Sequence, residues 1–373
     1  MRQSAKMRVG VLYGGRSGEH DVSLCSAASV VSALDPGKYE ITAIGIDRDG
    51  RWYVQEKPEI VSSKDFGRVL SLKKQGKWLV NHFEQGNKLH LYNLENSSAE
   101  VVIDIVFPVL HGTFCEDGTL QGLLELAMVP YVGADVIGSA VGMDKDIAKR
   151  LLQQAGIPVV PSLTINKQRW RNNPNVIIQH ALDKLGLPVF VKPVCTGSSV
   201  GVKKIKEKTS FAAAVDYAFQ FDNRVMIEKA IDCREIECSI LGNDNPQASI
   251  PGEILPSHEF YSYEAKYLDP EGAAMKIPAE IEASLAALIR EIAVQGYLAL
   301  GCSSMARVDF FLDKKTNEFY LNEINTLPGF TSISMYPKLW EATGLKYSDL
   351  LDKLIALALD RHQKKLEIKT DCF

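Results

Sequence analysis

The sequence predicts an α/β protein that divides into two or three domains. A chain of 373 residues with 46% hydrophobic side chains can bury a large core. Arg8 to Tyr13 has the pattern of a short apolar strand, and it enters a glycine-rich loop followed by helical periodicity from Val22 to Leu34. Such a unit opens many α/β domains. Residues 101–110, VVIDIVFPVL, have the composition of a buried strand.

Composition argues against several classes of protein. A net charge of -4 and an isoelectric point near 6.0 provide neither a basic surface for nucleic acid nor a polybasic membrane patch. Residues 1–20 lack the apolar centre of a secretory signal, and no apolar run is long enough to cross a bilayer, so we expect a cytoplasmic protein. Seven scattered cysteines without a CxxC pair indicate reduced thiols.

The loop after the first strand contains Gly14, Gly15 and a carboxylate, Glu19. The G-x-G-x-x-G spacing of a dinucleotide site is absent. Glu19 stands at a junction between loop and helix, where it could hold a substrate ammonium group or complement the helix N-terminus, and the sequence leaves both roles open. Tyr39 to Ile46 predicts a second strand. Residues 55–100 are poorly patterned and read as variable surface structure.

The buried strand at 101–110 delivers His111 at its expected C-terminal end, where parallel sheets usually bind ligands. His111 is therefore a candidate substrate contact, although a lone histidine is more often structural. Residues Ala140 to Ala155 predict one helix that contains Lys145 and ends before Pro158.

A second glycine-rich loop follows a strand at Pro188 to Val202, PVFVKPVCTGSSVGV. Its backbone N–H groups suit phosphate, and Lys192 would add positive charge. The loop is not a Walker A sequence, because no G-K-[ST] and no helix follow it. Strands are expected at 225–230 and 234–241, and the aromatic and charged residues 257–278 have the length of a lid loop. Helices are expected at 279–299 and 348–361.

Residues 304–312 and 318–325 predict a hairpin closed by a turn at 313–317. With that turn, Arg307, Asp309, Glu323 and Asn325 point to one face. Two carboxylates and an amide oxygen suit Mg²⁺, and Arg307 could hold a developing oxyanion. Taken alone, the hairpin favours a solvated polar face with cross-strand ion pairs, and the other motifs shift the balance.

Eight motifs, in this order over almost the whole chain, resemble those of D-alanine-D-alanine ligases: GGRSGEHDVS, HGTFCEDG, MDK, KPVCTGSSVG, EKAIDCREIEC, EFYSYEAKYL, ARVDFF and NEINTLPGFTSISMYP. The resemblance implies an ATP-grasp fold of three α/β domains. The expected domains are an N-terminal, Rossmann-like substrate domain at 7–132, a central subdomain at 133–228 and a C-terminal subdomain at 229–373 with the lid loop and the metal site.

The resemblance also implies a reaction, its cofactors and its residues. ATP would phosphorylate one D-alanine, and a second D-alanine would attack the acyl phosphate, giving the dipeptide for peptidoglycan. Two Mg²⁺ or Mn²⁺ and a homodimer are expected. The implied catalytic residues are Glu19, Ser198, Tyr267, Arg307 and Gly329; the substrate contacts are His111, Lys266, Ser334 and Met335. The nucleotide contacts are Lys145, Lys192, Glu228, Lys229, Ala230, Ile231 and Glu235; the metal ligands are Asp309, Glu323 and Asn325.

Related ligases that make D-alanyl-D-lactate lack the Lys-Tyr pair of this loop, so the resemblance implies that Lys266 and Tyr267 favour D-alanine as the second substrate. The apolar Met335 argues against a pocket that recognises the D-serine hydroxyl. Cys115 and Cys233 stand where the family more often has glycine, which a negative φ would permit. Two other protein classes are alternatives. A Rossmann-type dehydrogenase would need the dinucleotide-binding glycine spacing, which this sequence does not have. A regulatory protein that has lost catalysis should also have lost the metal ligands, which are present.

Overall fold

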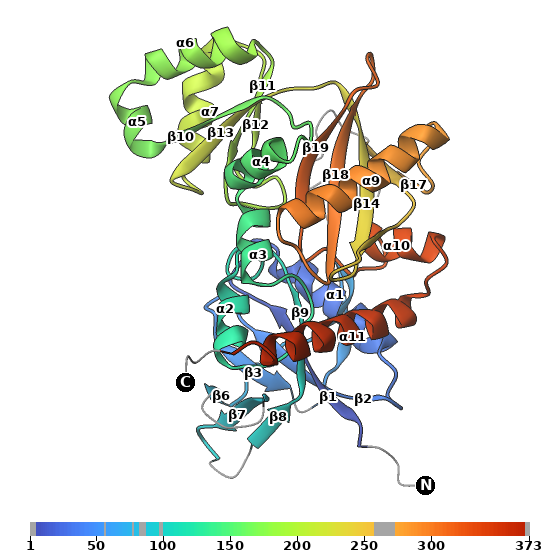
Figure 1. Cartoon of the computed structure of the whole chain (residues 1–373). Coiled ribbons are helices and arrows are strands. Elements are labelled where there is room, and N and C mark those ends of the chain that lie inside the picture. Colours follow the sequence, from blue (N-terminus) through green and yellow to red (C-terminus); the bar gives the residue numbers. More distant parts are fainter. Residues whose placement is uncertain are drawn as a thin grey trace.

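The computed structural model describes residues 5–55, 57–76, 78–81, 87–96, 100–256 and 273–369. Three larger sheets follow one another along the chain and lie in separate parts of the molecule (Figure 1). This is a mixed α/β architecture, as predicted.

The first sheet has the order β3-β2-β1-β9 and is built from Trp52–Gln55, Tyr39–Ile46, Met7–Gly14 and Ile105–Leu110. β1 pairs in parallel with β2 and β9. Val9, Val11 and Tyr13 of β1 pack with α1 (His20–Ala33) and α11 (Tyr347–Leu366), whereas Leu12 belongs to the core with α2 (Thr119–Leu126). Both faces of β1 are buried, which explains its continuous apolar run.

Residues 60–103 hold five short strands, of which the sequence analysis predicts only the last, as part of the strand at 101–110. They are β4 (Ile60–Ser63), β5 (Gly67–Leu70), β6 (Trp78–Asn81), β7 (Leu89–Asn93) and β8 (Glu100–Ile103), in two small antiparallel sheets. The interpretation of residues 55–100 as variable surface structure missed these strands, because strands of four or five residues show too little alternation to be recognised. The expected strand 101–110 is also two strands, divided at Asp104, whose carboxylate accepts hydrogen bonds from Arg8.

The central sheet is antiparallel, with the order β10-β13-β11-β12: Ser162–Asn166, Arg224–Lys229, Val189–Pro193 and Lys203–Ile205. Helices α5 (Lys167–Asn172), α6 (Pro174–Leu185) and α7 (Phe211–Ala218) share a core with it. Figure 1 shows this unit at the top of the molecule.

The helix expected at 140–155 is two helices, α3 (Val136–Met143) and α4 (Lys145–Gln154). The prediction was wrong because Asp144 ends the first and caps the second, accepting hydrogen bonds from the N–H groups of Asp146 and Ile147 at 3.1 and 3.0 Å. Lys145 is consequently the first residue of a helix and lies beside the Gly/Ser loop.

The third sheet has the order β17-β16-β14-β18-β19: Ala273–Lys276, Gly252–Pro256, Cys233–Leu241, Met305–Asp313 and Phe319–Asn325. β15 (Gln247–Ala248) pairs with β14. Helix α9 (Ala283–Ala299) covers one face, and α10 (Met335–Ala342), which was not predicted, packs near β14. The end of the expected lid loop is β17, whereas residues 257–272 lie outside the described part of the chain.

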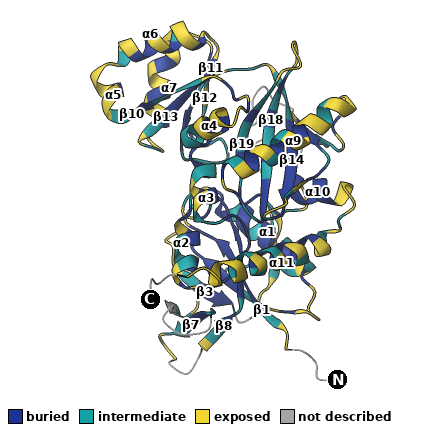
Figure 2. Ribbon diagram, in the orientation of Figure 1, coloured by how far each residue is buried: buried dark blue, intermediate teal, exposed yellow. Residues whose placement is uncertain are grey.

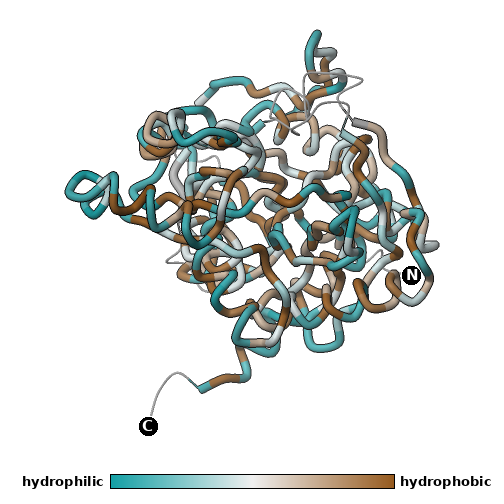
Figure 3. Tube along the Cα trace, turned by 90° about the horizontal axis from the view of Figure 1, so that it is seen from above, coloured by the Kyte–Doolittle hydropathy of each residue, from teal (hydrophilic) through white to brown (hydrophobic). Residues whose placement is uncertain are grey.

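Figure 2 shows the strands of the three sheets mostly buried and helices α6 and α11 exposed along their outer sides. In Figure 3, apolar stretches run through the body of the molecule, and several projecting turns are polar. Within the described residues, every helix is too short or too polar to traverse a bilayer.

Candidate active site

A row of polar side chains lies on one face of the third sheet. Cross-strand pairing sets Asp309 of β18 opposite Glu323 of β19, and Arg307 opposite Asn325. Their neighbours Val308 and Ile324 are buried in the core with α9, on the other face. The predicted common face is therefore present. We call these four residues, with Glu237 and Ser239 of β14, the polar face.

The pairing depends on a β-bulge that the sequence analysis missed. The hairpin turn spans residues 314–318, one residue later than predicted, and Leu312 pairs with Phe319. Continuing that register would bring Asn322 opposite Asp309. A shift between Asp309 and Phe310 instead brings Glu323 opposite Asp309. The extra residue thus returns both Glu323 and Asn325 to the polar face.

Arg307 and Asp309 form a bidentate pair. Nε and one terminal nitrogen of Arg307 donate to the two carboxylate oxygens of Asp309, both at 2.7 Å. Arg307 is largely buried, which by itself lowers its pKa, but Asp309 and Glu237 raise that pKa well above its ordinary value. The guanidinium is therefore always charged.

The donor set of the polar face fits a hard divalent cation. Asp309, Glu323 and Asn325 supply oxygen ligands from adjacent strands, and the buried Oδ1 of Asn325 accepts no hydrogen bond from the described residues. Among those same residues, no three His, Cys, Asp or Glu side chains already converge at metal-binding distance. The oxygens would have to close around an ion, to which each Asp309 oxygen could offer the lone pair that Arg307 does not use.

A buried charge cluster joins α4 to the central sheet. Glu228 of β13 forms ion pairs with Lys149 of α4 and, at 2.6 Å, with Lys192 of β11. Burial alone would raise the pKa of Glu228, but the two lysines hold it well below its ordinary value. Sequence reasoning selected Lys192 and Glu228 and missed Lys149. Its only signal was a position four residues after Lys145 on the same helix.

The Gly/Ser loop is held by the start of α4. Lys145 Nζ donates to the carbonyl of Thr196 at 2.6 Å, and its backbone N–H donates to Val194. Ser198 and Ser199 have positive φ values of 48° and 59°, a conformation uncommon for residues other than glycine. This tight loop forms the centre of the candidate phosphate site.

Glu19 reaches from the first domain to this loop. Ser198 Oγ donates a hydrogen bond to the Glu19 carboxylate. A Cβ atom at Gly197 would lie 3.1 Å from Glu19 Oε2, and one at Gly112 would lie 2.9 Å from it. The two glycines allow close approach on either side of the carboxylate. Glu19 is the N-cap of α1, but its side chain makes no capping hydrogen bond.

His111 connects the first domain to the turn after β19. Its Nδ1 lies 3.1 Å from the carbonyl of Leu327, and its Nε2 lies 3.3 Å from Ser26 Oγ. A carbonyl only accepts, so the Nδ1 nitrogen carries the proton. Glu116 lies 3.7 Å from Nδ1, and burial raises the pKa of Glu116. Sequence reasoning missed Glu116, although it belongs to the HGTFCEDG motif.

The turn at Gly329 is packed against the start of α10. A Cβ at Gly329 would lie 2.7 Å from Ser334 Oγ, which accepts a hydrogen bond from the backbone of Thr331 at 3.0 Å. The side chain of Met335 is buried against Gly252 and Ile254. A ligand could therefore contact the backbone of Met335 but not the end of its side chain.

The other expected site residues are placed less closely. Lys229 ends β13, Ala230 and Ile231 connect it to β14, and Glu235 lies on β14. Lys266 and Tyr267 fall outside the described residues. Cys115 and Cys233 do not adopt positive φ, so the backbone at these positions does not require glycine.

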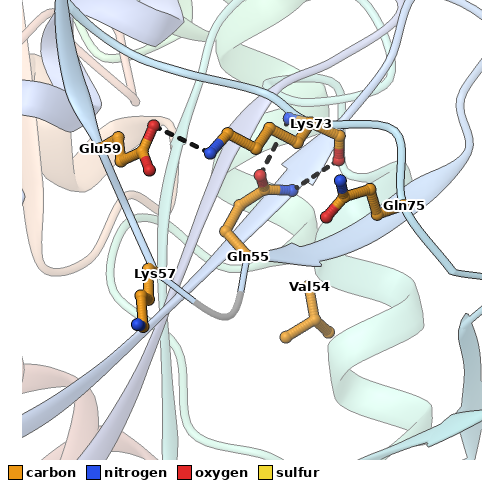
Figure 4. Close-up of a pocket in the computed structure, with 6 residues that line it drawn as sticks. All are labelled: Val54, Gln55, Lys57, Glu59, Lys73 and Gln75. Atoms are coloured by element: carbon orange, nitrogen blue, oxygen red, sulfur yellow. Dashed lines mark hydrogen bonds and ion pairs between the residues drawn. The ribbon is translucent and has the colours of Figure 1, made fainter.

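A pocket drawn in Figure 4 lies away from all of these residues. Gln55, Lys57, Glu59, Lys73 and Gln75 line it with Val54. Gln55 exchanges hydrogen bonds with the backbone of Lys73, and Lys73 pairs with Glu59 at 2.8 Å. Three of its polar residues thus interact with one another, and none of the expected site residues belongs to it.

Comparison with known proteins gives a consistent match. Residues 8–134 match the family model "D-ala D-ala ligase N-terminus", and residues 151–356 match "D-ala D-ala ligase C-terminus". A D-alanine–D-alanine ligase of Shouchella clausii is 48% identical over 371 residues, 99% of either chain.

Solved structures agree. The D-alanine-D-alanine ligase of Coxiella burnetii superposes with a TM-score of 0.79 at 39% identity, covering 98% of this chain and 97% of that one. The VanG D-Ala:D-Ser ligase of Enterococcus faecalis gives a TM-score of 0.79 at 36% identity over 95% of this chain and 100% of that one.

Proposed function

The chain belongs to the D-alanine–D-alanine ligase family, with its multidomain ATP-grasp fold, and from this premise we propose that it joins two D-alanines into D-alanyl-D-alanine. ATP is converted to ADP and phosphate, and the dipeptide serves peptidoglycan synthesis. The observation that carries the proposal is the hydrogen bond from Ser198 to Glu19. It sets a carboxylate suited to an amino-acid ammonium group beside a loop suited to phosphate, as phosphorylation of an amino acid requires.

In the first step, the γ-phosphoryl group of ATP passes to the carboxylate of the first D-alanine. Glu19 binds the ammonium group, and Lys145, Lys192 and the Gly/Ser loop hold the phosphates. Asp309, Glu323 and Asn325 would hold two Mg²⁺ or Mn²⁺, which would neutralise phosphate charge. Support comes from the donor set of the polar face and the unsatisfied Asn325 oxygen.

In the second step, the amine of the second D-alanine attacks the acyl-phosphate carbon. The amide bond forms, the amine loses a proton and phosphate leaves. Arg307 and the N–H of Gly329 stabilise the oxyanion. Ser198 and Tyr267 act with Glu19 around the first substrate, and His111 lines the same region.

The nucleotide base and ribose bind along the connection between β13 and β14. The contacts proposed there are Glu228, Lys229, Ala230, Ile231 and Glu235. The buried cluster around Glu228 supports this, because Lys149 and Lys192 fix its carboxylate in one place.

D-alanine is the proposed acceptor, bound through its carboxylate by Lys266, Ser334 and the backbone of Met335. A relative at 36% identity is named as a D-Ala:D-Ser ligase, so D-serine is the specific alternative. The Met335 side chain is buried against Gly252 and Ile254, and it offers no group that could hydrogen-bond the D-serine hydroxyl.

The proposed domains are 7–132, 133–228 and 229–373, and each contains one of the three larger sheets. We also propose a cytoplasmic homodimer. Light scattering on the purified protein measures the oligomeric state, and a monomer at micromolar concentration would exclude the dimer.

The function is tested by phosphate release from ATP and Mg²⁺ with D-alanine alone, D-alanine plus D-serine, D-alanine plus D-lactate, and L-alanine, with mass analysis of the product. The expected result is phosphate release matched by D-alanyl-D-alanine, with none from L-alanine. A mixed product would be consistent with the proposed mechanism but would refute the proposal that D-alanine is the acceptor. ATP binding without turnover would support the regulatory alternative.

A further inference from the structure

The polar face contains one carboxylate that the proposed chemistry leaves without a role. Glu237 of β14 lies directly opposite Asp309, which in turn lies opposite Glu323, so three carboxylates form a row across three strands. Glu237 is 7% exposed, and its neighbours Ile236 and Cys238 are buried in the core on the other face. A carboxylate buried to this extent requires a charged or hydrogen-bonding partner.

Arg307 is a partner of Glu237. Its Nε lies 3.1 Å from Glu237 Oε2, while Nε and a terminal nitrogen also bind Asp309 at 2.7 Å. One guanidinium is thus held from two sides, by a carboxylate on its own strand and by one on the neighbouring strand β14.

These two carboxylates differ in what else they must do. Asp309 is a proposed metal ligand, and the electron density that its oxygens would give to a cation would weaken the hydrogen bonds that they accept from Arg307. A cation at Asp309 would therefore loosen the hold of this carboxylate on Arg307. Glu237 lies on the far side of Asp309 from Glu323 and contacts Nε from the neighbouring strand.

We propose that Glu237 is a positioning residue that holds the Arg307 guanidinium on the polar face while Asp309 binds metal. This inference rests on the proposed function. It assigns Glu237 no contact with substrate: the carboxylate acts through Arg307, by fixing where its positive charge meets the reacting carboxyl group. Loss of that orientation should slow turnover more than it weakens ATP binding.

The first test is the variant Glu237→Gln, which keeps size and hydrogen bonding but removes charge. We expect kcat to fall at least about tenfold, with KM for ATP within about threefold of wild type, because the buried ion pair with Arg307 is lost. Glu237→Asp should recover part of that loss. A kcat within threefold of wild type would overturn the proposal.

A double-mutant cycle separates positioning from an independent role. In the Arg307→Lys background, Glu237→Gln should change kcat by less than about threefold, because its effect runs through the guanidinium. Losses that multiply in the double variant would refute the inference. If Glu237→Gln does not fold, the same cycle with Glu237→Asp decides the question.

A spectroscopic readout is independent of turnover. In protein saturated with Mg²⁺ and ADP, the ¹⁵Nε–H signal of Arg307, assigned by its absence in Arg307→Lys, should be protected from exchange in wild type and should lose protection in Glu237→Gln. Equal protection in both would contradict the proposal.

Glu253→Gln is the matched control. Glu253 is buried in the same sheet and pairs with Arg234 at 2.6 Å, away from Arg307. It should lower thermal stability and leave kcat unchanged. If the wild-type protein makes no dipeptide, the proposed function itself is refuted. If the wild-type protein is active and Glu237→Gln is equally active, only this inference is refuted.

Discussion

Lys149→Met tests the buried cluster between α4 and the central sheet. Lys149 is 4% exposed, pairs with Glu228 and donates to the carbonyl of Val160 at 3.2 Å. Methionine has a similar length but neither charge nor donor. The variant therefore removes one of two cations from a buried carboxylate and one donor from a buried carbonyl.

The expected loss of stability depends on the interactions that Glu228 keeps in the variant. Breaking a buried ion pair costs about 3–5 kcal/mol when the other charge is left alone. Here Lys192 stays 2.6 Å from Glu228 and retains part of the compensation. Adding about 1 kcal/mol for the carbonyl of Val160, we expect the free energy of unfolding to fall by about 3 kcal/mol.

Urea denaturation followed by circular dichroism measures this change, and Arg150→Met is its control. Arg150 lies on the same helix, is 65% exposed in its side chain and pairs with Asp146 at 3.0 Å. Its loss should cost about 0.5 kcal/mol or less.

Calorimetry should also show weaker ATP binding for Lys149→Met, because Glu228 loses one of its two fixed partners. A stability loss below about 1 kcal/mol, or equal to that of Arg150→Met, would refute the reasoning that both lysines compensate the buried charge.

Three further expectations concern separate regions. Hydrogen bonding from Arg8 lowers the pKa of Asp104 from 3.8 to about 2, so its contribution to stability is present above pH 4 and is lost as pH falls through 2. Asp104→Asn should lose about 1–2 kcal/mol at neutral pH and show flatter acid unfolding; an unchanged acid limb would exclude this role. Gly329→Ala should displace the Ser334 hydroxyl and lower kcat/KM for the acceptor about tenfold with ATP affinity unchanged, and a wild-type value would count against the contact. Asn325→Ala should raise the Mg²⁺ concentration needed for half-maximal activity, and an unaltered Mg²⁺ titration would remove it from the metal site.

The sequence predicted best the elements that are long and regularly patterned. The opening strand and helix α1, the strands flanking the Gly/Ser loop and the hairpin of β18 and β19 all lie near their expected residues. The helix break at Asp144 was missed because the apolar spacing continues through it, and only the capping geometry reveals two helices.

Residues whose role depends on a distant partner were harder to identify. The role of Lys149 depends on its ion pair with Glu228, and that of Glu237 on its ion pair with Arg307. The two members of each pair are separated by about 70 to 80 positions in the sequence. The alternation of Glu235, Glu237 and Ser239 along β14 was visible, but nothing in one strand says which strand lies beside it. Pairing order comes from the whole fold.

The bulge at Asn322 divides the hairpin into two parts. The turn at the tip tolerates changes in length, whereas the pairing of residues 323–325 at the base must keep its register. Adding or removing residues in the turn at 314–318 changes only the exposed end, because Phe319 to Leu321 can re-pair without moving the strand beyond the bulge. Deleting Asn322 would only remove the bulge, because Leu321 would stay opposite Phe310 and Glu323 opposite Asp309 in regular pairing. Deleting Ile324 instead would bring Asn325 opposite Val308, toward the core beneath α9. A peptide tag or fluorescent reporter can therefore be inserted at Lys315, whereas deletion of the single residue Ile324 would remove Asn325 from the polar face.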